Sequence, residues 1–327
     1  MKIHLAPMEG VVDHILRDLL TKLGGIDACV TEFIRVTQSV LPDRVFLDYC
    51  PELTTNSCTP SGTPISVQLL GSDLDMLAAN AQQAVKLGAK CIDMNFGCPA
   101  KTVNRHDGGA VLLKNPERLY QILHRLRTEI PIEIPVTAKM RLGFLDKSLY
   151  LENAEACEQA GAAHLVVHAR TKEEGYRPPA HWHFIADIRQ RLRIPVIANG
   201  DIFTVQDFLR CQEITGCDQF MLGRGLLQNP FLALEIKNHD AQIVVPQNSR
   251  TAADPHSLAE LLQNFFSRQR EVSDKLAVAR TKMWMKQLTS SHPSLIPLFD
   301  RIKIQLDASL MEKTLQEFFQ NLPENTI

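Results

Sequence analysis

Short apolar runs recur along the first 225 residues, and most of them are followed by a helical pattern. Residues 74–87 give an example, because Leu77, Ala81 and Ala84 recur at helical spacing and Gly88 ends the pattern. The eight runs that we predict as strands are residues 3–6, 28–33, 65–69, 91–94, 136–140, 165–168, 196–198 and 219–222.

The alternation of eight strands with helices predicts an α/β fold in which the strands close into a (β/α)8 barrel, the TIM barrel. A doubly wound open sheet is the alternative. That fold usually carries a glycine-rich turn after its first strand, where this chain has A-P-M-E-G at residues 6–10. The barrel is therefore favoured.

The pattern changes after residue 243. Residues 244–257 are mostly polar and contain two prolines, which is typical of a linker. Beyond them the apolar positions follow helical spacing throughout, over residues 258–271, 277–288, 297–305 and 310–321. We therefore expect a barrel domain over residues 1–243, a linker over 244–257 and a smaller all-α domain over 258–327.

Composition narrows the function classes. The 327 residues are 45% hydrophobic and 22% charged, with a formal net charge of -2, so the charge of the whole chain does not indicate a nucleic-acid binder. None of the eight cysteines forms a C-x-x-C pair, which disfavours a zinc site, and we expect no metal. Several cysteines lie in apolar strand or helix patterns, so we expect them to be buried thiols in a reducing compartment and not disulfides. The sequence shows no signal peptide and no apolar run long enough to cross a membrane, so we expect a cytoplasmic protein.

Polar side chains follow nearly every predicted strand. In a barrel the chemistry takes place at the carboxyl ends of the strands, and polar groups there are costly to bury without partners. They therefore predict a ligand site. These residues are Glu9, Glu32, Arg35, Gln68, Asn95, Lys139, Arg141, His168, Arg170, Asn199, Asp201 and Arg224.

The last two strands end in I-A-N-G-D-I and M-L-G-R-G-L. Each places a glycine at a turn where backbone N–H groups can point at a phosphate, and the loops after strands seven and eight are the usual phosphate site of this fold. Arg224 would add a charge-assisted contact. Gly200, Gly223 and Gly225 could also be simple turn glycines, but their occurrence at adjacent strand ends favours phosphate binding.

The sequence allows two roles for each of five other candidate site residues. His168 is either a satisfied interior histidine or a ligand contact. Lys139 either pairs with a carboxylate or faces a flavin ring, where a cation stabilises the reduced form. Arg35, Arg141 and Arg170 are either solvated charges at the rim or functional groups.

Seven stretches occur in an order that resembles the bacterial tRNA-dihydrouridine synthases. They are L-A-P-M-E-G-V at 5–11, S-V-Q-L-L-G at 66–71, D-M-N-F-G-C-P-A-K at 93–101, K-M-R-L-G at 139–143, H-A-R-T-K-E-E-G-Y at 168–176, I-A-N-G-D-I at 197–202 and M-L-G-R-G at 221–225. T-E-F-I-R-V at 31–36 and the helical tail look most like the branch that modifies uridine 16.

The resemblance implies FMN on a TIM barrel, NADPH or NADH as reductant and a uridine in the D-loop of tRNA as substrate. It implies no protein partner and is compatible with a monomer. Cys98 would be the general acid. The implied cofactor contacts are Pro7, Met8, Glu9, Gln68, Lys139, His168, Asn199, Gly200, Asp201, Gly223 and Arg224. The implied substrate contacts are Asn95, Arg141 and Tyr176. The chain departs from the family pattern at 105–107, R-H-D, where smaller residues are expected.

The chemistry that follows is the reduction of the uracil C5=C6 bond. Our hypothesis is that reduced FMN delivers hydride to C6 and Cys98 protonates C5. A thiol with a pKa of about 8.5 is mostly protonated at neutral pH, so it can act as an acid without a large shift. The rigid Gly-Cys-Pro turn limits its freedom.

A basic segment supports an RNA partner. Residues 268–286 contain six basic and two acidic residues. Such a face is often only solvated, but with the family resemblance Arg280 and Lys282 become the expected phosphate contacts, with Arg35 as a substrate-orienting residue on the barrel.

Two other functions remain open. A flavin oxidoreductase of the dihydroorotate dehydrogenase type would share the barrel and act on a free pyrimidine, without need of the basic tail. A tRNA-binding chaperone that has lost its chemistry would not need Cys98 or Lys139.

Overall fold

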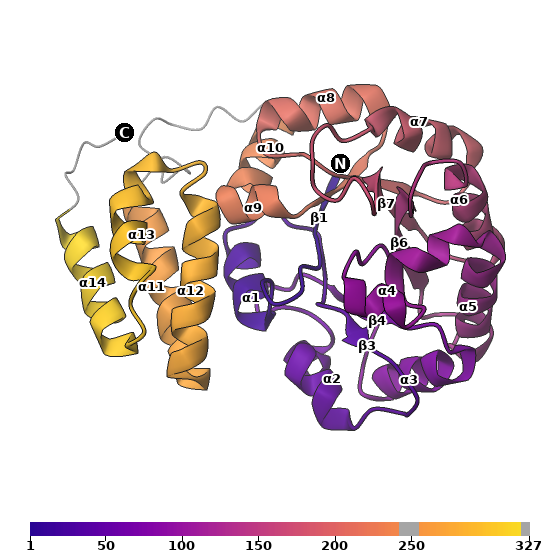
Figure 1. Cartoon of the computed structure of the whole chain (residues 1–327), viewed down its shortest axis with the longest axis horizontal. Helices are drawn as coiled ribbons and strands as arrows, with labels where there is room; N and C mark the ends of the chain where they lie inside the picture. The colour runs from indigo at the N-terminus through magenta and orange to yellow at the C-terminus, as the bar shows by residue number, and fades with distance from the viewer. Residues whose placement is uncertain (242–254, 322–327) are drawn as a thin grey trace. The chain divides into compact units, whose positions relative to one another are not determined.

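The computed structural model describes residues 1–241 and 255–321, and its main feature is a closed barrel of eight parallel strands (Figure 1). Strand β1 pairs with both β2 and β9, and β2 pairs with β4, so no barrel strand is left at an open edge. The strands are β1 (Lys2–Leu5), β2 (Ala28–Val30), β4 (Ile65–Leu70), β5 (Ile92–Phe96), β6 (Val136–Gly143), β7 (Leu165–Thr171), β8 (Val196–Asn199) and β9 (Gln219–Leu222).

Closure confirms the predicted barrel and excludes the open doubly wound sheet. Every pairing is parallel, as expected when a helix returns the chain between successive strands. The carboxyl ends of all eight strands therefore meet at one mouth, which is where the polar residues of the sequence were expected to converge.

The second strand is shorter than residues 28–33. It ends at Val30, because the Thr31 hydroxyl, rather than a backbone carbonyl, accepts the N–H of Gln68 at 3.0 Å. The chain then pairs again with β4 as the two-residue strand β3 (Ile34–Arg35). The interruption leaves Glu32 and Phe33 outside the ladder near the mouth, while the Thr31 N–H still donates to the Ser66 carbonyl at 3.0 Å.

Most helices of the first compact unit lie around these strands, whereas the short α4 lies inside the ring in this view (Figure 1). Good capping fixes the start of α3, where the Asp73 carboxylate accepts the N–H of Met76 at 2.9 Å. The helices are α2 (Asp43–Tyr49), α3 (Leu74–Lys86), α4 (Lys101–Arg105), α5 (Pro116–Glu129), α6 (Tyr150–Gln159), α7 (Trp182–Arg191) and α8 (Val205–Thr215), with 3-10 turns η1 (Pro51–Thr55) and η2 (Gly109–Lys114).

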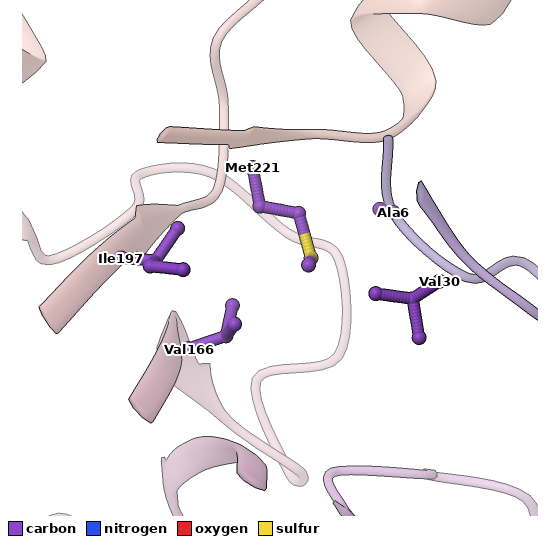
Figure 2. Close-up of a cluster of buried hydrophobic side chains, with 5 residues drawn as sticks. All are labelled: Ala6, Val30, Val166, Ile197 and Met221. Atoms are coloured by element: carbon purple, nitrogen blue, oxygen red, sulfur yellow. The ribbon is translucent and has the colours of Figure 1, made fainter. Parts of the chain in front are cut away.

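Small and branched side chains fill the inside of the barrel. Figure 2 shows five of them pointing toward one another, with the flexible Met221 side chain between Ile197 and Val30. The cluster consists of Ala6, Val30, Val166, Ile197 and Met221, all at most 5% exposed. Because the interior is packed, a ligand must bind above it, at the mouth.

A second compact unit is entirely helical. The indole of Trp284 is buried, contacts the Phe265 ring edge-to-face with 4.8 Å between centroids, and donates to the Leu227 carbonyl at 3.1 Å. The helices are α1 (His14–Lys22), α9 (Arg224–Gln228), α10 (Leu232–Asp240), α11 (Pro255–Val272), α12 (Asp274–Leu288), α13 (Ile296–Ile302) and α14 (Ala308–Gln320), with the 3-10 turn η3 (Pro293–Leu295).

The two compact units do not follow one cut in the sequence. The first comprises Met1–Glu9, Ile26–Ile202 and Gln206–Gly223, and the second Gly10–Gly25, Phe203–Val205 and Arg224–Ile327. Most of the linker expected at 244–257 lies outside the described residues, and α11 begins at Pro255. The boundaries at 243 and 258 stay predictions. Within residues 1–241 and 255–321 no helix is long and apolar enough to span a membrane.

Candidate active site

Cys98 lies on the turn that follows β5 at the barrel mouth. Its side chain is buried at 8% exposure and packs with Leu70, Val103 and the partly buried Phe33. Burial raises the pKa of the Cys98 thiol above its ordinary value; the Glu9 carboxylate adds to this, and a hydrogen bond with the backbone of Ala100 opposes it. The thiol is therefore protonated at neutral pH, as a general acid must be.

The loop that follows Cys98 contacts it through hydrogen bonds and close packing. The Cys98 carbonyl accepts two hydrogen bonds, from the Ala110 backbone at 3.1 Å and from the Asn104 amide at 3.0 Å. Gly109 has φ +67°, and a Cβ there would lie 2.9 Å from the Cys98 carbonyl oxygen and 3.0 Å from its Cβ. Sequence reasoning did not find Asn104 or Gly109. The Gly108–Gly109 pair, ten residues beyond the cysteine, was the available signal.

This packing makes Gly109→Ala a sharp test of how Cys98 is held. We expect the variant to displace the Cys98 turn and to slow substrate protonation by about tenfold or more, since misplacing a reacting group by about 1 Å has effects of this size or larger. Single-turnover kinetics of the reduced enzyme measures the step.

Gly62→Ala is the matched control. Gly62 also has positive φ, at +85°, but a Cβ there meets nothing within 4 Å, so the control carries the backbone strain alone. Equal rates for the two variants would show that the contact of Gly109 with Cys98 is unimportant.

The residues that depart from the family pattern, 105–107, lie at the end of α4 and just after it. Arg105 ends the short helix α4, and His106 and Asp107 follow it at the surface. Asp107 takes positive φ, at +56°, and its carboxylate lies 3.9 Å from Arg118. Gly108 and Gly109 then return the chain to Cys98.

Gln68 and Asn95 lie side by side on β4 and β5. Both are buried, and the Asn95 amide donates to the Gln68 side-chain oxygen at 2.8 Å. The structure therefore brings together one predicted cofactor contact and one predicted substrate contact. The hydrogen-bond chain to which they belong also contains Asp93, which the sequence reasoning did not single out.

Lys139 and Arg141 lie on β6, and each has another cationic side chain nearby. Arg141 lies near Lys139, and Arg170 lies near Arg141. Burial and the charge of Arg141 lower the pKa of Lys139 to about 8, while Asp93 partly opposes them. Arg141 is 2% exposed and donates to three carbonyl oxygens, those of Gly97 at 2.8 Å, Thr171 at 3.1 Å and Gly175 at 2.9 Å. A solvated rim position is therefore wrong for Arg141, since its guanidinium joins the Cys98 turn to the end of β7.

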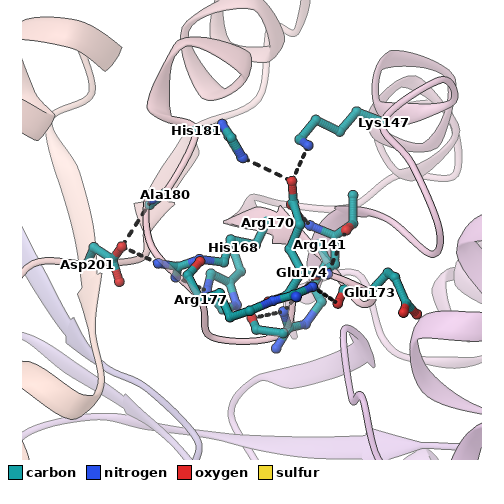
Figure 3. A network of polar contacts seen from close by, with 12 residues as sticks. Arg141, Lys147, His168, Arg170, Glu173, Glu174, Arg177, Ala180, His181 and Asp201 are labelled. Carbon is teal, nitrogen blue, oxygen red and sulfur yellow. Dashed lines mark hydrogen bonds and ion pairs between the residues drawn. The ribbon is translucent and has the colours of Figure 1, made fainter.

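A second buried guanidinium belongs to Arg170 on β7 (Figure 3). It is 0% exposed, forms an ion pair with Asp201 and donates to the Arg177 carbonyl at 2.6 Å. Its Nη1 also lies 3.4 Å from Nε2 of His168. Arg170 is thus not a solvated rim charge either, because its partners lie on the loops after β7 and β8.

Asp201 is held in place by this pair. Its carboxylate also accepts the backbone N–H of Ala180 at 3.0 Å, and its backbone has positive φ, at +52°. On the loop after β7, Glu174 pairs with Lys147 and with His181 (Figure 3). The network fixes the β7 and β8 loops around His168.

Tyr176 and Arg35 are the exposed members of the predicted substrate contacts. The Tyr176 ring is 54% exposed, lies 5.3 Å from the Arg141 guanidinium and 6.1 Å from the His168 ring. Arg35 ends β3 and is exposed. An exposed aromatic ring over a buried cation is suited to stacking against a base.

The ends of β8 and β9 carry the predicted phosphate site. The Asn199 amide donates to the Met221 carbonyl at 2.6 Å. Gly200 has φ +122°, a conformation that side chains rarely adopt, and a Cβ there would lie 3.1 Å from the His168 ring. Gly223 lies close to Met8, whose sulfur would be 3.5 Å from a Cβ at that position. Glycine is thus required at residue 200 by the backbone.

Arg224, Arg280 and Lys282 lie in the second compact unit. Arg224 begins α9, and its guanidinium lies 5.3 Å from the Phe203 ring. Arg280 is paired with Asp13 at 2.6 Å, and Lys282 donates to the carbonyl of Gln305. The two predicted phosphate contacts of α12 are thus engaged within their own unit.

Acidic groups gather near the end of β1. Pro7 and Met8 are partly buried, and Glu9 follows them. Desolvation, with the charge of Glu32 as the second cause, raises the pKa of Glu9 to about 7. The pKa of Tyr49 is raised by burial and by the same two carboxylates.

Replacing Glu9 with glutamine should flatten part of the pH dependence of stability. Because the pKa of Glu9 is higher in the folded protein than in the unfolded chain, ionisation opposes folding, and stability falls as the pH rises from about 4.5 to about 7. Glu9→Gln should therefore gain stability over the wild type as the pH rises through this range. Thermal unfolding between pH 4.5 and 8 measures it, with Glu133→Gln as the exposed control. A constant difference between variant and wild type across this range would contradict the assigned pKa.

No group of three or more His, Cys, Asp or Glu side chains suited to a metal ion occurs in the part of the chain that the structure describes. The described chemistry is instead a protonated thiol, a lysine and glycine-bearing turns at one barrel mouth. Fold and site together define a (β/α)8-barrel enzyme whose candidate reactive groups lie at the carboxyl ends of the strands.

The chain belongs to the Dihydrouridine synthase (Dus) family, which it matches over residues 4–317. It is 47% identical over 319 residues to the tRNA-dihydrouridine(16) synthase of Neisseria meningitidis serogroup B, covering 97% of this chain and 94% of that protein. It is 49% identical over 317 residues to the protein of the same name from Pseudomonas putida, covering 96% of each. The resemblance stated from the sequence is therefore confirmed.

Solved structures agree on the fold. The chain is similar to a 2-naphthoyl-CoA reductase in complex with 2-naphthoyl-CoA, with a TM-score of 0.57 and 10% identity. The match covers 73% of this chain and 50% of that one. At this identity the likeness concerns the fold alone.

Proposed function

We propose that this chain reduces the C5=C6 bond of uridine 16 in the D-loop of tRNA, with FMN as the bound cofactor and NADPH as the reductant. The observation that carries the chemistry is Cys98, a buried and protonated thiol on a turn held from both sides at the barrel mouth. The position rests on relatives at 46–49% identity whose names specify uridine 16.

The residues at the mouth fit a flavin mononucleotide. Gly200 leaves space beside His168, because a Cβ there would lie only 3.1 Å from the ring, and Gly223 presents no side chain next to Met8. Lys139 is a cation below about pH 8 and would face the electron-rich edge of the ring. The proposed cofactor contacts remain Pro7, Met8, Glu9, Gln68, Lys139, His168, Asn199, Gly200, Asp201, Gly223 and Arg224.

One contact is refined by the geometry. The Asp201 carboxylate is committed to Arg170 and Ala180, and a second anion beside it would be repelled. We therefore expect Asp201 to contribute its backbone, in a left-handed conformation, while cationic contact to a phosphate would come from Arg224, the neighbour of Gly223 in the chain.

The protein residues have three tasks in the reaction. A bound reduced flavin supplies the hydride that C6 requires. Cys98 holds the proton at its sulfur until C5 becomes basic, and general-acid participation is worth about 10²–10⁴-fold. Asn95 and Tyr176 would orient the base, and Arg141 keeps the Cys98 turn against β7.

The RNA must present a nucleotide out of its stack, since a base inside a helix cannot reach the barrel mouth. Arg35 is exposed for a backbone contact. At α12, a phosphate would compete with the Asp13 carboxylate at Arg280 and with the Gln305 carbonyl at Lys282, so the exposed Lys275 and Lys286 are the less hindered contacts of that helix. A tRNA substrate would place the enzyme in the cytoplasm.

The test is reduction of unmodified tRNA by the purified protein with FMN and NADPH, compared with free uracil and orotate. Dihydrouridine in the tRNA alone is the expected result. Reduction of the free pyrimidines alone would favour a dihydroorotate dehydrogenase-like activity. Purified protein that binds tRNA but no flavin would favour the chaperone.

A further inference from the structure

The turn that carries Cys98 is connected to the barrel interior by a chain of side-chain hydrogen bonds. Its first link is the backbone N–H of Gly97, the residue before Cys98, which donates to the Asn95 side chain at 2.8 Å. A backbone N–H can only donate, so the Asn95 atom that receives it must be the amide oxygen. This link sets the direction of every bond that follows.

This assignment then fixes the orientation of two side-chain amides. With its oxygen toward Gly97, Asn95 turns its NH2 toward Gln68 and donates to the Gln68 oxygen at 2.8 Å. Gln68 in turn presents its NH2 to Asp93, where it donates to Oδ2 at 2.7 Å. The opposite orientation of either amide would place two donors or two acceptors face to face.

The chain ends on Asp93, whose carboxyl group lies on β5 and whose exposure is 1%. Its second oxygen, Oδ1, accepts the Thr137 hydroxyl at 2.6 Å. A carboxyl group is costly to bury, and strand neighbours such as Ile92 and Met94 are apolar. A structural role alone would be met by an apolar residue, whereas both Asp93 oxygens are used as acceptors.

We propose that Asp93 is a positioning residue that fixes the orientation of the Gln68 and Asn95 amides and, through Asn95, the turn that presents Cys98. Arg141 holds the same turn from its other side, because its Nε donates to the Gly97 carbonyl at 2.8 Å. The importance of Cys98 rests on the proposed function. The orientation of the Gln68 and Asn95 amides does not depend on the proposed function.

The acceptor, rather than the negative charge, carries this role. An asparagine at residue 93 can present its oxygen to Gln68 and its NH2 to the Thr137 hydroxyl, which then accepts. The reversed arrangement would turn the Asn95 NH2 against the Gly97 N–H, and that donor–donor contact disfavours it. A leucine at residue 93 offers no acceptor, so the Gln68 amide loses its fixed orientation.

The test compares Asp93→Leu with Asp93→Asn in the full chain by hydrogen exchange at the Gly97 amide. Exchange should be about 5- to 100-fold faster in Asp93→Leu than in the wild type, the range expected for loss of a buried hydrogen bond. Asp93→Asn should stay within about threefold, as should Thr137→Val, which leaves the Gln68 link intact. The rate of Cys98 alkylation, followed by mass spectrometry, should rank the variants in the same order as hydrogen exchange at the Gly97 amide.

Unchanged Gly97 exchange in Asp93→Leu would overturn the proposal. Equal acceleration in Asp93→Asn and Asp93→Leu would also overturn it, since charge and not the acceptor would then matter. If Asp93→Leu does not fold, Gln68→Met is used instead. It removes the amide that links Asp93 to Asn95, and it must accelerate hydrogen exchange at the Gly97 amide. None of these measurements needs tRNA, so a failure of the proposed function leaves them interpretable.

Discussion

Replacing Cys98 with alanine should slow the reduction of tRNA uridine by about 10²–10⁴-fold, the usual contribution of a general acid. Binding and reduction of the flavin should persist, because Cys98 is not among the proposed cofactor contacts. Single-turnover reaction of the prereduced enzyme with tRNA isolates the step. The variant removes a thiol that burial keeps protonated, and nothing else in its packing cluster of Leu70, Val103 and Phe33 can donate a side-chain proton.

Cys58→Ala is the control, because it removes a partly exposed thiol from a turn before β4. Its single-turnover rate should match the wild type. A Cys98→Ala rate within about threefold of the wild type would remove Cys98 from the reaction, given the size expected of an acid.

Replacing Asp201 with alanine should destabilise the fold by about 3–5 kcal/mol, the usual cost of leaving a buried charge without its partner. Arg170 is 0% exposed, and the Asp201 side chain is 15% exposed. The free energy of unfolding in denaturant measures the effect. The double variant Asp201→Ala/Arg170→Met should be less destabilised than Asp201→Ala alone, because no buried guanidinium remains.

Asp107→Ala separates this effect from backbone strain. Asp107 has φ +56°, close to the +52° of Asp201, and its exposed carboxylate lies 3.9 Å from Arg118. The control should cost only about 1 kcal/mol or slightly more, from the left-handed backbone and a surface pair. Equal losses for Asp107→Ala and Asp201→Ala would mean that the Arg170 pair does not stabilise the fold.

Apolar periodicity was sufficient to predict the barrel, because eight buried parallel strands give short apolar runs separated by helices. The predicted strand at 219–222 coincides with β9 (Gln219–Leu222). The strand at 28–33 was too long, since a hydroxyl at Thr31 replaces a ladder carbonyl, and a single sequence does not show which partner an N–H will choose.

The sequence predicted which polar residues lie at the strand ends of the candidate site. It did not predict which residues they pair with. The sequence left Arg141 and Arg170 open between solvated rim charges and functional groups, because their acceptors are backbone carbonyls and a carboxylate on loops up to 44 residues away in the sequence. Asp93 was passed over inside an apolar strand, where its partners Gln68 and Thr137 come from the neighbouring strands. Such contacts depend on register, which local pattern does not give.

The helical unit shows the same limit. The predicted helices of residues 258–321 occur, but α1 belongs to the same compact unit, and Asp13 joins it to the later helices. Its carboxylate caps α1 at the N–H of Leu16, at 2.9 Å, and also binds Gln269 and Arg280. The cap joins residues three positions apart, whereas Gln269 lies 256 residues away from Asp13 in the sequence, so a local pattern does not show that partner.

The most direct test of the account is to map dihydrouridine in tRNA from cells that lack this protein, with and without a plasmid that restores it. Loss of dihydrouridine at position 16 alone, restored by the wild type and not by Cys98→Ala, is the predicted result. Unchanged modification at position 16 in the deleted cells, or loss at another position instead, would contradict it.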